Sequence, residues 1–110
     1  MTEAQEQAAV IDWCGWKRIP VFHIPNGGSR NPAEAANLKR QGVKAGVPDL
    51  FVPVAASGCH GLFIEMKRER GGRVSEAQRR WLALLDAQGY RASVCRGAEE
   101  AIREIEGYLG

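Results

Sequence analysis

Residues 49–67 read DLFVPVAASGCHGLFIEMK, two apolar runs separated by turn-forming residues. This pattern predicts strands over 49–54 and 62–67, joined by a turn over 57–61. Two strands that are joined by so short a connection pair in antiparallel fashion. The beginning of the first strand is therefore expected beside the end of the second.

The second of these strands carries its charged side chains on one face. Successive side chains of a strand point to opposite faces, so Phe63, Glu65 and Lys67 share a face and the even-numbered residues share the other. Asp49 opens the first strand, directly after a tight GVP turn. Antiparallel pairing is expected to bring Asp49 beside Glu65 and Lys67.

Two carboxylates that meet at a strand end offer the hard oxygen ligands that Mg²⁺ and Mn²⁺ prefer. The backbone carbonyl of Met66 is a candidate for a further ligand. Lys67 would hold a phosphate oxygen, or position the attacking water and help to deprotonate it, in a metal-assisted in-line hydrolysis. An isolated E-x-K is more often a solvated strand edge, and an aspartate after proline is more often a turn residue. The combination is more specific, because it requires the hairpin that the sequence independently predicts.

The rest of the chain predicts helices around a small sheet. Helices are expected over 3–14, 33–40, 75–88 and 98–109, and further strands over 19–24 and 91–95. Pro20 favours an edge position for the first strand, and a helical crossover allows the last two strands to be parallel. The sequence therefore predicts an α/β fold, a small mixed β-sheet flanked by α-helices.

The composition is that of an ordinary globular chain. Its 110 residues are 45% apolar and 25% charged, and we expect one domain over 1–110. The apolar run 50–56 is too short to span a membrane, and residues 1–7 do not resemble a secretion signal, so we expect a cytoplasmic protein. The three cysteines lack the spacing of a zinc site, and Cys14 and Cys95 fit apolar patterns as core residues.

Basic residues gather after the E-x-K strand. Within fourteen residues the chain has Lys67, Arg68, Arg70, Arg73, Arg79 and Arg80. The formal net charge of +2 does not by itself indicate a nucleic-acid partner. Arginine suits phosphate, although a solvated basic loop and helix face explains the cluster equally well. The polar loop from Asn26 to Arg30 would contact a phosphate backbone, or would form a surface turn with no partner.

Histidine and tryptophan residues are interpreted structurally. His23 is more consistent with a packed histidine than with a general base. Trp13, Trp16 and Trp81 are more consistent with core or dimer-interface positions than with platforms for base stacking.

The motifs GVPDL (46–50), FIEMK (63–67) and SEAQ (75–78) resemble the PD-(D/E)xK nuclease superfamily. More closely, the chain resembles the VRR-NUC family in its stand-alone phage and bacterial form. This resemblance runs from TEAQEQAAVI (2–11) through HIPNGGSR (23–30) to AIREIEGYL (101–109). It implies a restriction-endonuclease-like core and a metal-dependent endonuclease.

The resemblance also implies roles for individual residues. Asp49 and Glu65 match the metal ligands of the family, and Lys67 matches its motif lysine. The family has a glutamate in its first helix that reaches the metal, often through water. We prefer Glu3 over Glu6, because Glu3 lies on the helix stripe that faces the protein. Either acid is alternatively a solvated first-turn residue that the helix dipole favours.

Gln78 matches a glutamine that the family places near its active site. The same residue has the spacing to complete a capping box with Ser75. The two roles are compatible, because a helix N-terminus beside a metal also attracts phosphate.

The function implied is a Mg²⁺- or Mn²⁺-dependent DNA endonuclease that binds mainly phosphates. The candidate DNA contacts are Asn26, Arg30, Arg68, Arg73 and Arg79. One chain supplies one site, so two opposed cuts require two subunits, and a homodimer is expected. By resemblance to Holliday-junction resolvases, branched DNA is the implied substrate, in phage or bacterial DNA processing or repair. A replication protein or helicase is a candidate partner.

Other functions are considered beside this one. A non-catalytic nucleic-acid-binding accessory module is the main alternative, and the intact set of Asp49, Glu65 and Lys67 argues against it. A site-specific restriction nuclease needs a recognition region, for which 110 residues leave little room. An RNA substrate stays open, although no RNA-binding motif is recognisable.

Overall fold

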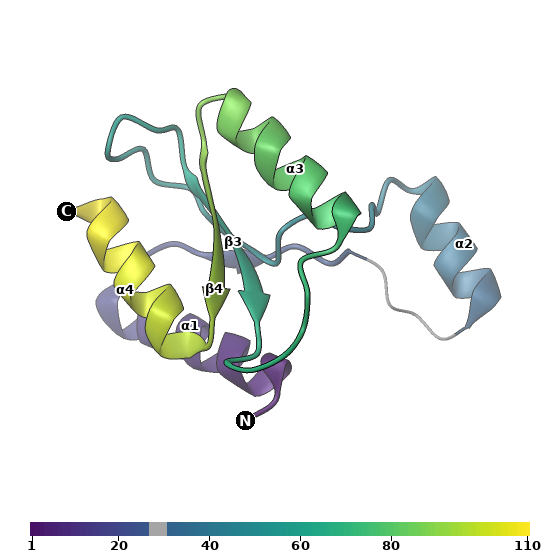
Figure 1. Ribbon diagram of the computed structural model, residues 1–110, viewed down its shortest axis with the longest axis horizontal. Helices are drawn as coiled ribbons and strands as arrows, with labels where there is room; N and C mark the ends of the chain where they lie inside the picture. Colours follow the sequence, from purple (N-terminus) through teal and green to yellow (C-terminus); the bar gives the residue numbers. More distant parts are fainter. Residues whose placement is uncertain (27–30) are drawn as a thin grey trace.

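The computed structural model describes residues 1–26 and 31–110, which form four helices and four strands (Figure 1). In chain order these are α1 (Glu3–Lys17), β1 (Phe22–His23), α2 (Pro32–Arg40), β2 (Leu50–Val52), β3 (Leu62–Lys67), α3 (Glu76–Ala87), β4 (Arg91–Arg96) and α4 (Ala98–Leu109). The strands form one sheet in the order β1-β2-β3-β4. The pairs β1–β2 and β2–β3 are antiparallel and β3–β4 is parallel, so the predicted mixed sheet is confirmed.

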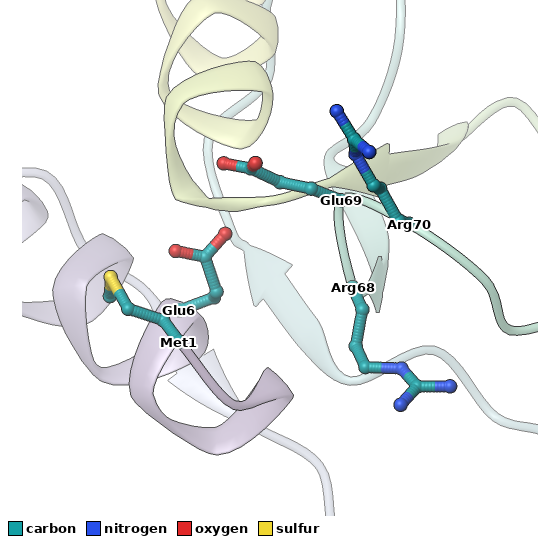
Figure 2. Close-up of a pocket in the computed structure, with 5 residues that line it drawn as sticks. All are labelled: Met1, Glu6, Arg68, Glu69 and Arg70. Carbon is teal, nitrogen blue, oxygen red and sulfur yellow. The ribbon is translucent and has the colours of Figure 1, made fainter.

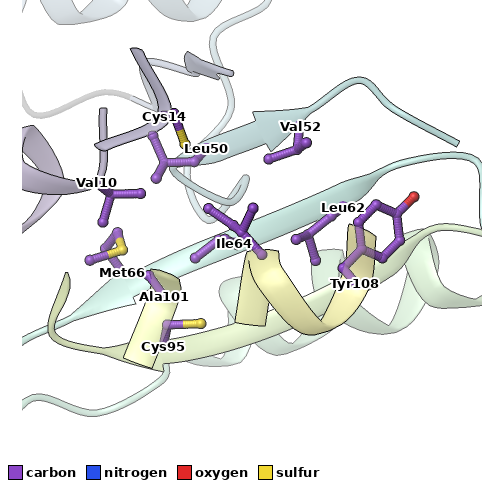
Figure 3. Close-up of a cluster of buried hydrophobic side chains, with 11 residues drawn as sticks. Val10, Cys14, Leu50, Val52, Leu62, Ile64, Met66, Cys95, Ala101 and Tyr108 are labelled. Carbon is purple, nitrogen blue, oxygen red and sulfur yellow. The ribbon is translucent and has the colours of Figure 1, made fainter. Parts of the chain in front are cut away.

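The core lies between one face of the sheet and the helices α1 and α4 (Figure 3). Its buried side chains are Val10, Cys14, Leu50, Val52, Leu62, Ile64, Met66, Cys95, Ala101, Ile105 and Tyr108. The even-numbered residues of β3 all point into this core, as the alternation predicts. Cys14 and Cys95 are also buried there, which confirms their assignment as core residues.

Three predicted elements have wrong boundaries, for local reasons. Strand β2 was expected over 49–54 but contains only Leu50–Val52, because Pro53 has no N–H for a ladder. Helix α1 does not stop at Gly15 but continues to Lys17, and Arg18 ends it in the left-handed conformation (φ 58°). The first strand was expected over 19–24 but contains only Phe22 and His23. Pro20 has no N–H for a ladder, and the residues before Phe22 connect the helix to the sheet. The strand does occupy an edge of the sheet, as predicted.

Helix α3 lies on the face of the sheet that α1 and α4 leave uncovered, and α2 stands away from the rest of the molecule (Figure 1). The predicted capping box of α3 is present: the Ser75 hydroxyl accepts from the Gln78 N–H, and the Gln78 side chain accepts from the Ser75 N–H. Trp13 and Trp81 are half-buried, but Trp16 is 88% exposed, so a core position for Trp16 is wrong. It lies in the last turn of α1, beyond the stripe that packs on the sheet.

None of the helices in the described part of the chain is long and apolar enough to cross a membrane.

Candidate active site

Three carboxylates from separate elements converge at one end of the hairpin. One carboxylate oxygen from each of Glu3, Asp49 and Glu65 lies within 4.8 Å of the other two. The register of β2 and β3 pairs Leu50 with Ile64, so Asp49 comes opposite Glu65. Asp49 is 8% exposed and Glu65 is 2% exposed, whereas Glu3 is open to solvent. The cluster is therefore buried at Asp49 and Glu65 and open to solvent at Glu3.

The position of Asp49 is fixed by the backbone around it. Its Oδ2 accepts a 2.8 Å hydrogen bond from the backbone N–H of Met66. The loop before it approaches the start of α3 so closely that a Cβ on Gly46 would lie 2.7 Å from the backbone of Ala77. Gly46 also has a φ of +89°, which favours glycine. The turn that leads into Asp49 therefore packs against the first turn of α3.

Glu65 has only one of its two oxygens hydrogen-bonded. Its Oε2 accepts from the Gln78 side-chain amide at 3.2 Å, so Gln78 both caps α3 and contacts the acidic cluster. Its Oε1 is buried and has no hydrogen-bond partner among the described residues. Buried polar atoms without a partner are rare in folded proteins, because each one costs desolvation free energy. The cluster therefore contains an oxygen that a cation would satisfy.

The pKa of Glu65 is raised to about 8, first by burial and then by the nearby carboxylates of Asp49 and Glu3, while Lys67 opposes the shift. Without a cation, this carboxyl is therefore mainly protonated at neutral pH. A divalent cation among the three acids would reverse that balance, since it favours the charged form of each.

Lys67 is buried beside these acids, with 8% of its surface exposed. Its backbone carbonyl accepts a 2.9 Å hydrogen bond from Gly97, where β4 ends. No ion pair within 4.0 Å among the described residues includes Lys67. Its ammonium group, beside the acidic cluster, is therefore available to bind a ligand.

This arrangement can be compared with known proteins. The model of the VRR-NUC domain family matches residues 1–99. The chain belongs to the VRR-NUC domain family. A solved structure named VRR_NUC domain protein is 34% identical and superposes with a TM-score of 0.84, covering 99% of this chain and 88% of that chain. No curated protein matches the chain.

The protein is thus a nuclease-family domain, and its four-stranded sheet with flanking helices is compatible with a restriction-endonuclease-like α/β core. Membership of a nuclease family indicates DNA as the partner and, in general, the use of a divalent metal ion. The acidic cluster lies within the matched residues, as do Lys67 and Gln78.

The second glutamate of α1 in this VRR-NUC domain has a different position from the first. Glu6 is 6% exposed, and its Oε2 accepts a 3.0 Å hydrogen bond from the backbone N–H of Ala98. That bond caps α4, whose N-cap residue is Gly97 and offers no side chain. Of the two candidates, the structure places Glu3 in the carboxylate cluster and uses Glu6 to join α1 to α4.

A pocket of about 390 Å³ lies beside the start of α1 (Figure 2). It is lined by Met1, Glu6, Arg68, Glu69 and Arg70. Arg68 is exposed at its edge, and Arg73 and Arg79 are exposed farther along the chain. Of the four arginines that were predicted to contact phosphates, the three that the structure describes are therefore accessible.

Arg96 organises the loop that carries two of these arginines, a role that the sequence analysis missed. Its guanidinium donates to the backbone carbonyls of Gly71 at 2.7 Å and Gly72 at 3.2 Å. Arg96 lies opposite Lys67 in the parallel register of β3 and β4. Its place at the end of a strand beside the E-x-K strand was the available signal.

The loop after β1 contributes internal hydrogen bonds. The Asn26 side chain donates to the Val47 carbonyl at 2.8 Å, which ties this loop to the GVPD turn. Arg30 lies outside the described residues. His23 is exposed rather than packed, and its Nδ1 lies 2.8 Å from the Asp49 carbonyl oxygen and 3.1 Å from the Gln7 amide nitrogen. Strand β1 is at the sheet edge, which leaves this ring exposed.

Proposed function

We propose that this VRR-NUC domain, residues 1–110, is a Mg²⁺- or Mn²⁺-dependent DNA endonuclease. The observation that carries the proposal is the buried Glu65 Oε1, which has no partner among the described residues and belongs to a cluster of three carboxylates within 4.8 Å. An all-oxygen donor set of this kind suits hard divalent cations. Glu3, Asp49 and Glu65 would hold the ion, with the Met66 carbonyl as a further ligand.

The chain's own residues would then divide the work of hydrolysis. When bound, the cation supplies positive charge against the scissile phosphate. Lys67 would hold a phosphate oxygen, or position the attacking water and help to deprotonate it. Gln78 would keep Glu65 oriented through its 3.2 Å hydrogen bond. Asp49 would stay fixed through the Met66 N–H.

The DNA would be bound chiefly through its phosphates. Asn26, Arg30, Arg68, Arg73 and Arg79 are the proposed contacts. Because phosphate contacts carry little sequence information, selectivity would come from DNA structure, with a Holliday junction or other branched DNA as substrate. Two opposed cuts would require a homodimer. The setting would be DNA processing or repair in the cytoplasm of a bacterial or phage-infected cell, with a replication protein or helicase as partner.

The test is a cleavage assay on labelled DNA of three shapes. Purified protein is incubated with a four-way junction, a flap and a plain duplex in Mg²⁺, in Mn²⁺ and in EDTA. We expect metal-dependent cutting that Asp49→Asn and Lys67→Ala abolish and that Asp86→Asn, an exposed change on α3, leaves intact. Paired symmetric cuts in the junction would support the dimer. Tight DNA binding without cutting in either metal would instead support a non-catalytic accessory module.

A further inference from the structure

A groove of about 450 Å³ opens on the face of the sheet that carries the active site. Its lining is largely apolar and aromatic, and includes Val43, Lys44, Val47, Phe63, Trp81 and Leu85. A cavity of this size lies in the range that holds small organic ligands. Phe63 and Trp81 are only half-buried, so their rings keep accessible surface in the groove.

Two elements connect the lining of the groove with the acidic cluster. On β3, Phe63 precedes Glu65 by two residues on the same face, a separation of about 7 Å. On α3, Trp81 follows Gln78 by three residues and so lies on the same side of the helix. Since Gln78 contacts Glu65, the two elements run side by side from the site into the groove.

The GVPD turn gives a third connection. Val47 lines the groove two residues before Asp49, and the Asn26 side chain holds its carbonyl in place at 2.8 Å. Lys44 adds a positive charge to the lining, which complements a phosphate backbone. A strand of DNA whose phosphate lies at the three acids would therefore meet an apolar, aromatic wall about one nucleotide away.

Two neighbouring rings pack against Phe63 in this wall. The Phe63 ring stacks on Phe51 with centroids 4.2 Å apart, and Tyr90 meets it edge-on at 5.3 Å. Ring contacts from two neighbours fix the orientation of Phe63, so its accessible surface is already arranged for stacking. A ligand with a planar, largely apolar ring and a negatively charged backbone would complement both the aromatic lining of the groove and the positive charge of Lys44.

We propose that the groove holds an unpaired nucleobase next to the scissile phosphate. The substrate would then be branched DNA with at least one unpaired nucleotide at the cut, such as a flap rather than a fully paired four-way junction, because a base within a duplex is stacked and paired and cannot enter. This inference rests on the proposed nuclease function. It assigns Trp81 and Phe63 to substrate binding, whereas the sequence alone favours core or interface positions for the tryptophans.

The test compares two single strands that have the same charge. Binding of a labelled ten-residue thymidine oligonucleotide and of an abasic strand of equal length is measured by fluorescence anisotropy, in EDTA so that neither is cut. Stacking of a base on an aromatic side chain predicts that the wild type binds the thymidine strand about 5- to 150-fold more tightly. Trp81→Leu and Phe63→Leu should each remove most of this difference while leaving the affinity for the abasic strand unchanged.

Trp16→Leu is the matched control, because Trp16 is 88% exposed at the end of α1, away from the groove. It should bind both strands as the wild type does. Circular dichroism and Mn²⁺ titration of each variant show whether the fold and the acidic cluster are retained, and Trp81→Leu gives the test if Phe63→Leu does not fold.

Three outcomes would overturn the inference. They are equal binding of both strands by the wild type, a base preference that both groove variants retain, and a wild-type dimer that Trp81→Leu dissociates. If the protein cuts duplex DNA with Mn²⁺ but shows no base preference, the proposed nuclease function is supported and base binding in the groove is contradicted. If the protein prefers the thymidine strand but cuts no DNA in any metal, base binding in the groove is supported and the nuclease function is contradicted.

Discussion

The backbone N–H of Met66 donates a 2.8 Å hydrogen bond to Oδ2 of Asp49. A donor that belongs to the β3 backbone cannot rotate away, so the carboxylate is held in place before any ligand arrives. The bond joins the middle residue of E-x-K to the acid of the GVPD turn. Pre-orientation of this kind lowers the entropic cost of binding a cation.

Replacing Asp49 with asparagine separates its charge from its structural bond. The asparagine oxygen still accepts from Met66, so we expect the thermal midpoint of the metal-free protein to change little. The lost negative charge should weaken Mn²⁺ binding by at least about a hundredfold, the upper end of the cost of losing a residue that only supports a metal ligand. Isothermal titration calorimetry measures this, and unchanged affinity would remove Asp49 from the ligand set.

The stability of the metal-free protein should fall as pH rises from 4.5 toward 8. The pKa of Glu65 is about 8 in the folded protein against an ordinary 4.5, so between these values the native state binds more protons than the unfolded state. Its contribution is complete below 4.5 and is lost as pH rises through 8. The slope should reach about 1.4 kcal/mol per pH unit. Glu65→Gln should reduce this dependence of the unfolding free energy on pH, as measured by urea unfolding at each pH. An equal dependence in both proteins would contradict the raised pKa of Glu65.

Metal binding should release a proton from the same group. Near pH 7 the cation must displace the proton of Glu65, whose pKa of about 8 lies above that pH. We expect apparent Mn²⁺ affinity to rise by up to about tenfold per pH unit between pH 6 and 8. Calorimetry in buffers of different ionisation enthalpy counts the protons released, and a value near zero at pH 7 would show that Glu65 is already charged.

The two roles of Gln78 can be separated with Ser75. Ser75→Ala removes a cap of α3 and should cost about 1 kcal/mol of stability, with little effect on cleavage. Gln78→Ala removes the cap and the hydrogen bond to Glu65, and should lower the cleavage rate by about 10- to 100-fold. Single-turnover rates with saturating Mn²⁺ make the comparison. Equal rates for the two variants would leave Gln78 with a capping role only.

Arg96→Lys tests whether the guanidinium arranges the basic loop. Lysine keeps the charge but cannot reach both the Gly71 and Gly72 carbonyls in the same way. We expect trypsin to cut at Arg70 and Arg73 about 5- to 30-fold faster, because the loop opens more easily. DNA affinity should fall while Mn²⁺ affinity stays constant. Arg103→Lys, an exposed change on α4, is the control and should alter none of these quantities.

Substitutions of Glu3 and Glu6 should have different effects on stability and on metal binding. Glu6→Ala leaves the Ala98 N–H without its acceptor, which should cost about 1–2 kcal/mol and lower the thermal midpoint by about 5 °C or more. Glu3→Gln should leave that midpoint unchanged and weaken Mn²⁺ binding. Thermal melts with and without Mn²⁺ distinguish the two. The reverse pattern would exchange their roles.

Local patterns were enough to predict most of the fold. The alternation of β3, the capping box of α3 and the limits of α4 each depend on residues a few positions apart, and all three are confirmed. The antiparallel hairpin followed from the short turn, and it is what brings Asp49 opposite Glu65. Helical spacing also predicted that Glu3 faces the body of the protein, and the structure places Glu3 in the acidic cluster.

The contacts that escaped prediction are those between distant parts of the chain. Glu6 and Ala98 are 92 residues apart, and Arg96 reaches carbonyls more than 20 residues away. A charged side chain that bonds to backbone groups leaves no periodic signal, since any sequence offers the same N–H and C=O groups. Such partners become visible only when the packing of helices on the sheet is known.

The bonds of residues 97 and 98 also bear on truncated forms of the protein. Gly97 donates to the carbonyl of Lys67, and Ala98 donates to Glu6 on α1, so the start of α4 joins the two elements that bear Glu3 and Lys67. These bonds add to the core packing of α1 against β3. We expect a chain cut before Gly97 to position Glu3 less precisely and to bind Mn²⁺ more weakly.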